Sequence, residues 1–73
     1  MVKDNNSKYK RFEIEASECD LQIGSRVTPE TIIGRDFETG EMMAAGCRGR
    51  VASINFNATD HTLIVVVTLE KNL

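Results

Sequence analysis

Hydrophobic and polar residues alternate with a period of two along most of this chain, which is typical of strands with one buried face. Between residues 9 and 16, Phe12, Ile14 and Ala16 fall on one side, and charged residues fall on the other. Further strands are expected at residues 31–37, 41–45 and 50–57. Since no stretch of the sequence keeps the 3.6-residue period of a helix, the pattern predicts an all-β fold.

The strongest strand signal covers residues 62–70, where apolar residues occupy both faces. Such a strand is either central in a sheet or has its outer face covered by a partner. The core is expected to take the larger set, Leu63, Val65, Val67 and Leu69. Ile64 and Val66 point the other way. They lie either under a second layer formed by Phe12 and Ile14, or on a face for self-association or partner binding.

Glycine and proline mark the connections between these strands. Leu21 and Ile23 are expected to form a short strand that ends at Gly24, before a turn around an inward Val27. The sequence Asp-Phe-Glu-Thr-Gly-Glu at residues 36–41 predicts a hairpin whose glycine adopts a positive φ.

Two irregularities are expected within the strands. Gly34 interrupts a β-branched segment, and a glycine inside a strand is typical of a bulge. Val51 is out of phase with Ile54, which predicts a second bulge or twist between them.

Residues 24–33, Gly-Ser-Arg-Val-Thr-Pro-Glu-Thr-Ile-Ile, resemble the biotinyl/lipoyl-type family, and Gly49-Arg50-Val51 matches its G-x-V corner. The resemblance covers residues 21–67 and implies a small barrel or barrel-sandwich hybrid of about five to six short antiparallel strands. Carrier domains of this family bear a modified lysine on an exposed hairpin. Here the hairpin reads Phe-Glu-Thr-Gly-Glu-Met-Met and has no lysine, so neither the carrier chemistry nor a cofactor is expected.

The length of 73 residues allows one small domain, expected at residues 9–73 after a flexible tail at residues 1–8. A domain of this size is marginally stable without help from a partner. Its net charge of −2 gives no general attraction to nucleic acid or to an anionic membrane. The sequence has neither a membrane-spanning apolar run nor a secretory signal, so we expect a cytoplasmic protein with no membrane partner.

No catalytic or metal site is expected, and the chain is not interpreted as an enzyme. A Ser–His–Asp grouping is not expected, because the single histidine, His61, lies in a polar loop. Cys19, Cys47 and His61 match no zinc-binding spacing. The two cysteines are expected to be free thiols in a reducing compartment. Arg48 beside Cys47 leaves a reactive cysteine as a minor alternative, because nearby cations activate a thiol.

Two functional classes remain open. The first is a non-catalytic interaction module, or an accessory subunit of a larger complex, that binds a protein partner or associates with itself. The second is a barrel of the SH3-like or KOW-like kind that associates with nucleic acid or ribonucleoprotein, because residues 49–54 also resemble the G-x-V-x-x-I corner of those barrels.

The candidate interaction residues are Arg26, Arg35, Arg48, Arg50, Ile64 and Val66. The four arginines either gather into a patch that contacts phosphate or an acidic surface, or are solvated and paired with nearby carboxylates. No aromatic residue alternates with them in the sequence, which counts against the stacking of nucleic-acid bases.

Overall fold

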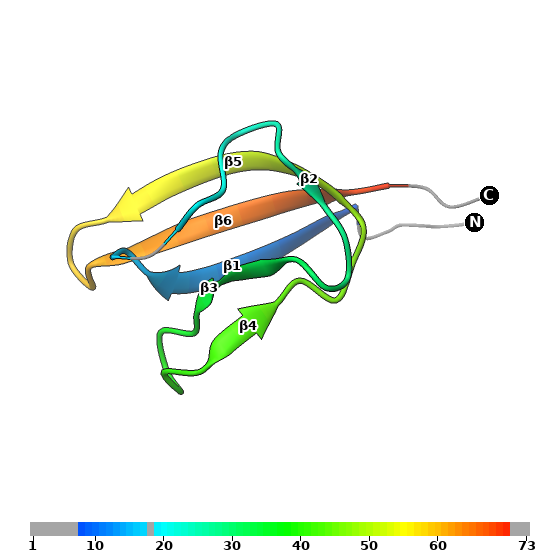
Figure 1. Cartoon of the computed structure of the whole chain (residues 1–73). Coiled ribbons are helices and arrows are strands. Elements are labelled where there is room, and N and C mark those ends of the chain that lie inside the picture. Colours follow the sequence, from blue (N-terminus) through cyan, green and yellow to red (C-terminus); the bar gives the residue numbers. More distant parts are fainter. Residues whose placement is uncertain (1–7, 18, 71–73) are drawn as a thin grey trace, which may run out of the picture.

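The structure, a computed structural model, describes residues 8–17 and 19–70 and is all-β throughout these residues (Figure 1). Its strands are β1 (Tyr9–Glu15), β2 (Arg26–Val27), β3 (Ile32–Arg35), β4 (Met42–Ala44), β5 (Gly49–Asn57) and β6 (Thr62–Leu69). The tail expected at residues 1–8 lies outside the described residues except for Lys8, whose carbonyl oxygen accepts a hydrogen bond from the Leu69 N–H at 2.8 Å.

The strands form a four-stranded antiparallel sheet in the order β1-β6-β5-β2, and a two-stranded sheet of β3 and β4. Figure 1 shows the long strands β1, β6 and β5 curling side by side, with the β3–β4 hairpin against one side. The hairpin is joined to the end of β1 by a bridge between Ile14 and Asp36 and by a hydrogen bond from Phe37 N–H to the Glu13 carbonyl. The predicted small-barrel-like, all-β class is therefore confirmed.

The core lies between the curled sheet and the hairpin. Its buried side chains are Phe12, Ile14, Val27, Ile33, Ala45, Val51, Val65 and Val67. As predicted, Val65 and Val67 are fully buried, and Leu63 and Leu69 pack against the same cluster.

The pairing of β1 with β6 shows which face of β6 is shared by Phe12 and Ile14. Phe12 is the partner of Val65 and Ile14 is the partner of Leu63, and partners in an antiparallel pair share one face of the sheet. Phe12 and Ile14 therefore lie on the inner face of the sheet, beside Val65 and Leu63 of β6. The idea that they form a second layer over Ile64 and Val66 is wrong.

The two predicted bulges are present. The register of β3 against β4 shifts between Ile32 and Gly34, and that of β5 against β6 shifts between Val51 and Ser53. The second shift explains the change of phase along β5, because an extra residue moves the later side chains to the other face.

The strand expected at Leu21 to Gly24 is absent, and the strand that pairs with β5 comes later, at Arg26–Val27. The segment instead closes a turn in which the Ser25 N–H donates to the Gln22 carbonyl at 2.9 Å. The Ser25 hydroxyl accepts the Gln22 N–H at 3.0 Å. These local bonds take up backbone groups that a strand would need. Val27 is buried, as predicted.

Asp36 begins the β3–β4 turn, and its carboxylate accepts hydrogen bonds from the backbone N–H groups of Thr39 at 2.8 Å and Glu38 at 3.1 Å. The Thr39 N–H is the main cause of a pKa for Asp36 below its usual 3.8, and desolvation acts in the opposite direction. Because the pKa of Asp36 is lower in the folded protein than in the unfolded chain, its ionised carboxylate stabilises the fold. This contribution is complete above the pKa of the unfolded chain, and it is lost as the pH falls through the pKa of the folded protein.

We expect the amide resonances of Thr39 and Glu38 to shift in an NMR titration as pH falls below the usual aspartate pKa of 3.8. Asp36→Asn is the matched control, because the amide keeps an acceptor oxygen but does not titrate there. Equal shifts in the wild type and in Asp36→Asn would contradict this role of the carboxylate.

Gly40 closes the same turn with a φ of 77°, as predicted, and a Cβ there would meet open space. Gly40→Val is expected to lower the free energy of unfolding by about 1–2 kcal/mol, because a β-branched residue is strained at positive φ. Gly40→Asn should cost less, because asparagine tolerates this region. Chemical denaturation measures both, and equal stability of the valine variant and the wild type would show that the strain is relieved elsewhere.

Candidate interaction surface

The outer face of the four-stranded sheet is the side opposite the core, and cross-strand partners arrange its side chains in rows. Four rows follow one another from the start of β1 to its end. The first row is Tyr9, Thr68, Arg50 and Arg26, and the second is Arg11, Val66 and Ser53. The third row is Glu13, Ile64 and Asn55, and the fourth is Glu15, Thr62 and Asn57, so that the rows end as β1 ends. The first of these is called the basic row below, and the last is called the acidic row.

Ile64 and Val66 form an aliphatic pair at the centre of the outer face. Both are half-buried, whereas Val65 and Val67, which point inward from the same strand, are fully buried. The charged frame of the pair comes from β1, where Arg11 is the partner of Val66 and Glu13 is the partner of Ile64. The structure thus places the two predicted aliphatic residues on the outer face.

The basic row brings together two of the predicted arginines, because Arg26 and Arg50 are direct cross-strand partners. Arg50 Nη1 donates to the Gly24 carbonyl at 3.2 Å. Arg26 Nη1 lies 3.9 Å from Glu70 Oε2, with side chains 61% and 38% exposed, so this ion pair is weak. Like charges on opposed strands destabilise a sheet, so this pairing is not explained by stability.

The other two predicted arginines differ in location. Arg48 is exposed beside the basic row, and its carbonyl accepts the Glu70 N–H at 2.9 Å. Arg35 belongs to β3 in the second sheet, where Nη1 donates to the Gly40 carbonyl at 2.7 Å and supports the hairpin turn. The structure therefore gathers Arg26, Arg48 and Arg50 near one end of the sheet and places Arg35 on the hairpin.

Tyr9 is a member of the basic row that the sequence did not reveal. It is 64% exposed and is the partner of Thr68, which in turn is the partner of Arg50. An aromatic ring therefore does share a row with the arginines, although none is near them in the sequence. The alternation of β1 indicates which residues share its outer face, but the order of strands is needed to place Tyr9 beside Arg50.

Charge is sorted along the outer face. The first half of β1 contributes Arg11, and the second half contributes Glu13 and Glu15. The Thr62 hydroxyl, which is buried, donates to Glu13 Oε2 at 2.8 Å and fixes this carboxylate beside β6. The face therefore changes from basic to acidic along the strand direction, with the aliphatic pair between the two ends.

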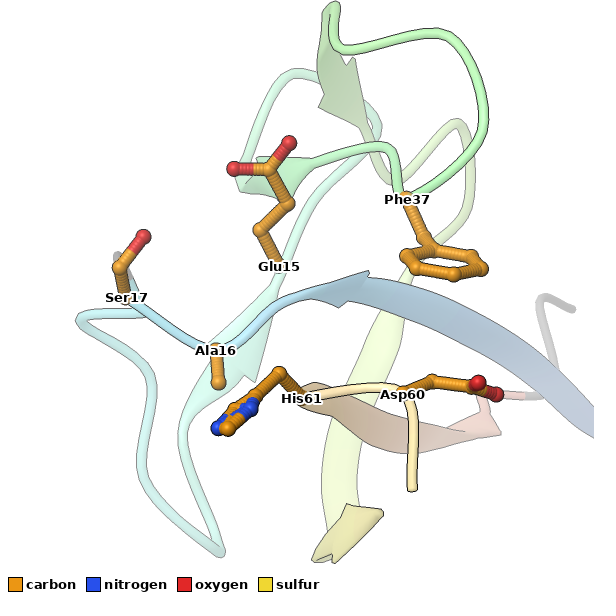
Figure 2. A pocket seen from close by; sticks show the side chains of 6 residues that line it. All are labelled: Glu15, Ala16, Ser17, Phe37, Asp60 and His61. Carbon is orange, nitrogen blue, oxygen red and sulfur yellow. The ribbon is translucent and has the colours of Figure 1, made fainter. Parts of the chain in front are cut away.

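A cavity of about 530 Å³ lies at the acidic end and is lined by Glu15, Ala16, Ser17, Phe37, Asp60 and His61 (Figure 2). It brings a serine, a histidine and an aspartate together, which the sequence did not lead us to expect. In Figure 2 the Ser17 hydroxyl is directed away from the His61 ring, and the Asp60 side chain extends to the other side. A serine nucleophile and its base must be within hydrogen-bond reach, so this arrangement is not a catalytic triad.

The cysteines do not join this cavity. Cys19 and Cys47 are free thiols, half-buried against the core, and His61 makes an edge-on ring contact with Phe56 at 5.9 Å. Among residues 8–17 and 19–70, no three metal-ligating side chains come close enough together to hold a metal ion. This part of the chain also holds no helix long and apolar enough to cross a membrane.

Comparisons with protein-family models, curated proteins and solved structures found no match to this chain. The resemblance to the biotinyl/lipoyl-type family therefore stays a prediction.

Proposed function

We propose that the chain is a non-catalytic interaction module that binds protein through the outer face of its four-stranded sheet. The observation that supports this most is the aliphatic pair of Ile64 and Val66, which is half-buried on the central strand within a frame of opposite charges. An apolar centre inside a polar rim is the usual anatomy of a protein interface.

The composition of the outer face favours a protein as the ligand. Both signs of charge are present within a few residues, on Arg11 and Glu13, so a surface of one sign would be repelled at one end. The small size of the domain adds to this argument. Association stabilises a folded state by mass action, and a domain of this length has little stability in reserve.

Val66→Lys tests this proposal, with Ala58→Lys as the matched control. Ala58 is exposed in the β5–β6 turn, so the control adds the same charge away from the outer face. We expect Val66→Lys to stay folded and to lose association, because a lysine at the centre of an apolar contact must be desolvated. Ala58→Lys should associate as the wild type does.

Two measurements together detect association with a second copy of the chain and binding of a different protein. The first is sedimentation velocity of the purified chain, and the second is mass spectrometry of proteins retained from a lysate by each variant. A folded Val66→Lys variant with the self-association and retained proteins of the wild type would contradict the proposal.

One observation favours a second candidate, association with single-stranded nucleic acid. Tyr9 lies in one row with Arg26 and Arg50, and an aromatic ring beside cations is the usual pairing for base stacking with phosphate contact. Against it, the acidic row occupies the other end of the same face, and the chain has a net charge of −2. We therefore place it second.

Fluorescence anisotropy with a labelled oligonucleotide at low salt separates the two candidates, with Tyr9→Ala and Arg50→Ala as probes. The protein-binding function predicts no binding that depends on these residues. Binding that falls with rising salt and that is lost in both variants would favour the second candidate.

A further inference from the structure

We infer that the protein bound by the outer face is a second copy of this chain, turned end over end so that the strands of the two copies run in opposite directions. This inference rests on the proposed function and specifies its partner. The order of charges in the four rows of the outer face carries it.

Two copies related by a twofold axis must present the same surface to each other, so every contact occurs twice. An axis that lies between the sheets and runs perpendicular to the strands reverses their direction and exchanges the second and third rows. Arg11 of each copy then lies over Glu13 of the other, and Val66 lies over Ile64. The face is therefore complementary to itself in both charge and apolar contact.

The ends of the face agree with the same arrangement. The basic row of one copy lies over the acidic row of the other, so Tyr9 of one copy meets Glu15 of its partner copy. Arg50 meets Asn57, whose side-chain oxygen is an acceptor. The phenol hydroxyl of Tyr9 and the guanidinium of Arg50 thus each find an acceptor across the contact.

The alternative twofold axis runs along the strands and gives the opposite result. It keeps each row level with itself and, when it is centred on β6, it places Arg11 of one copy over Ser53 of the other and Glu13 over Asn55. This dimer therefore has no contact between opposite charges on the outer face, whereas the end-over-end dimer has two, each between Arg11 and Glu13. The charge order therefore selects the end-over-end orientation.

The dimer is weak because the contact is small. Strands are about 4.8 Å apart and alternate residues about 6.8 Å apart, so four rows across three strands cover roughly 20 by 14 Å. A standard interface buries about 800 Å² on each partner, which is well above this. We expect a dissociation constant between about 10 µM and 1 mM, and a dimer that weakens with added salt.

Exchanging the two charges tests the orientation directly. Arg11→Glu alone places a glutamate over Glu13 of the other copy, and Glu13→Arg alone places an arginine over Arg11. Each single variant should associate at least about tenfold more weakly than the wild type, while the double variant, Arg11→Glu with Glu13→Arg, should recover. An equimolar mixture of the two single variants should also associate, because the mixed dimer has two opposite-charge contacts.

The charge exchange at position 13 also removes the hydrogen bond from the Thr62 hydroxyl. A third variant therefore separates the loss of the charge from a change in the fold. Glu13→Gln keeps an acceptor oxygen for Thr62 and removes only the charge, and it should weaken association with an unchanged circular dichroism spectrum.

Sedimentation equilibrium at low salt, from micromolar to millimolar protein, measures all these variants. Recovery in the double variant and in the mixture would support the end-over-end dimer. A wild type that stays monomeric at millimolar concentration, or a double variant as weak as the single variants, would overturn it. If retention of a different protein is lost in Val66→Lys while the wild type stays monomeric, the proposed function holds and this inference fails.

Discussion

Gly49→Ala is expected to destabilise the protein by about 3 kcal/mol or more, which is most of the stability of a domain that has only about 5 kcal/mol. Gly49 is buried at the start of β5, as the partner of both Val27 and Leu69. A Cβ there would collide with the carbonyl oxygen of Thr68 and lie 2.9 Å from its carbonyl carbon. Because these are backbone atoms of the central strand, no side-chain rotation relieves the contact.

Gly24→Ala is the control that separates this collision from the general cost of replacing a glycine. Gly24 has a φ of 92°, but no atom lies within 4 Å of the place that a Cβ would occupy, so only backbone strain of about 1–2 kcal/mol is expected. Urea denaturation of both variants measures the difference. A Gly49→Ala variant no less stable than Gly24→Ala would show that β5 and β6 separate easily, and would contradict the packing described for them.

Val65→Lys is expected to prevent folding, whereas Val66→Lys is expected to leave the fold intact. Val65 is 0% exposed and faces Phe12 across β1 and β6. A lysine there buries an unpaired charge, at a cost of more than about 4 kcal/mol. Val66 lies on the half-buried outer face beside Arg11, where a lysine reaches water and adds at most about 1 kcal/mol of repulsion.

The two variants are matched, because they place the same residue at neighbouring positions of one strand. Thermal unfolding followed by circular dichroism measures both. A folded Val65→Lys together with an unfolded Val66→Lys would mean that β6 has the opposite face inward. Two unfolded variants would mean that both faces are buried within the chain, which would remove the basis for an open outer face.

Local patterns predicted most of the fold. Alternation alone placed β1, β5 and β6 within one or two residues, and the out-of-phase Val51 indicated the bulge that the register confirms. The prediction of a short strand at Leu21 was wrong, because an alternation of only two apolar residues cannot be distinguished from a turn closed by Ser25. Which short segment pairs with β5 depends on non-local contacts, and the sequence pattern does not contain them.

The candidate site was predicted only in part, for the same physical reason. Ile64 and Val66 were identifiable because an apolar residue on each face of one strand is a local signal. Arg11 and Glu13 look like an ordinary solvated face until the pairing of β1 with β6 places them beside the aliphatic pair. The nearness of Tyr9 to the arginines likewise follows from the strand order β1-β6-β5-β2.

The most direct test of the outer face as the contact surface is a concentration series of ¹⁵N-¹H correlation spectra of the wild-type chain at low salt. Amide shifts are expected to grow with concentration and to be largest at Arg11, Glu13, Ser53, Ile64 and Val66. The spectrum of Val66→Lys should not change over the same range. Shifts confined to the β3–β4 hairpin or to the cavity around Phe37 and His61 would show that the outer face is not the contact surface. A wild-type spectrum that does not change up to millimolar concentration would show that the chain does not associate with itself.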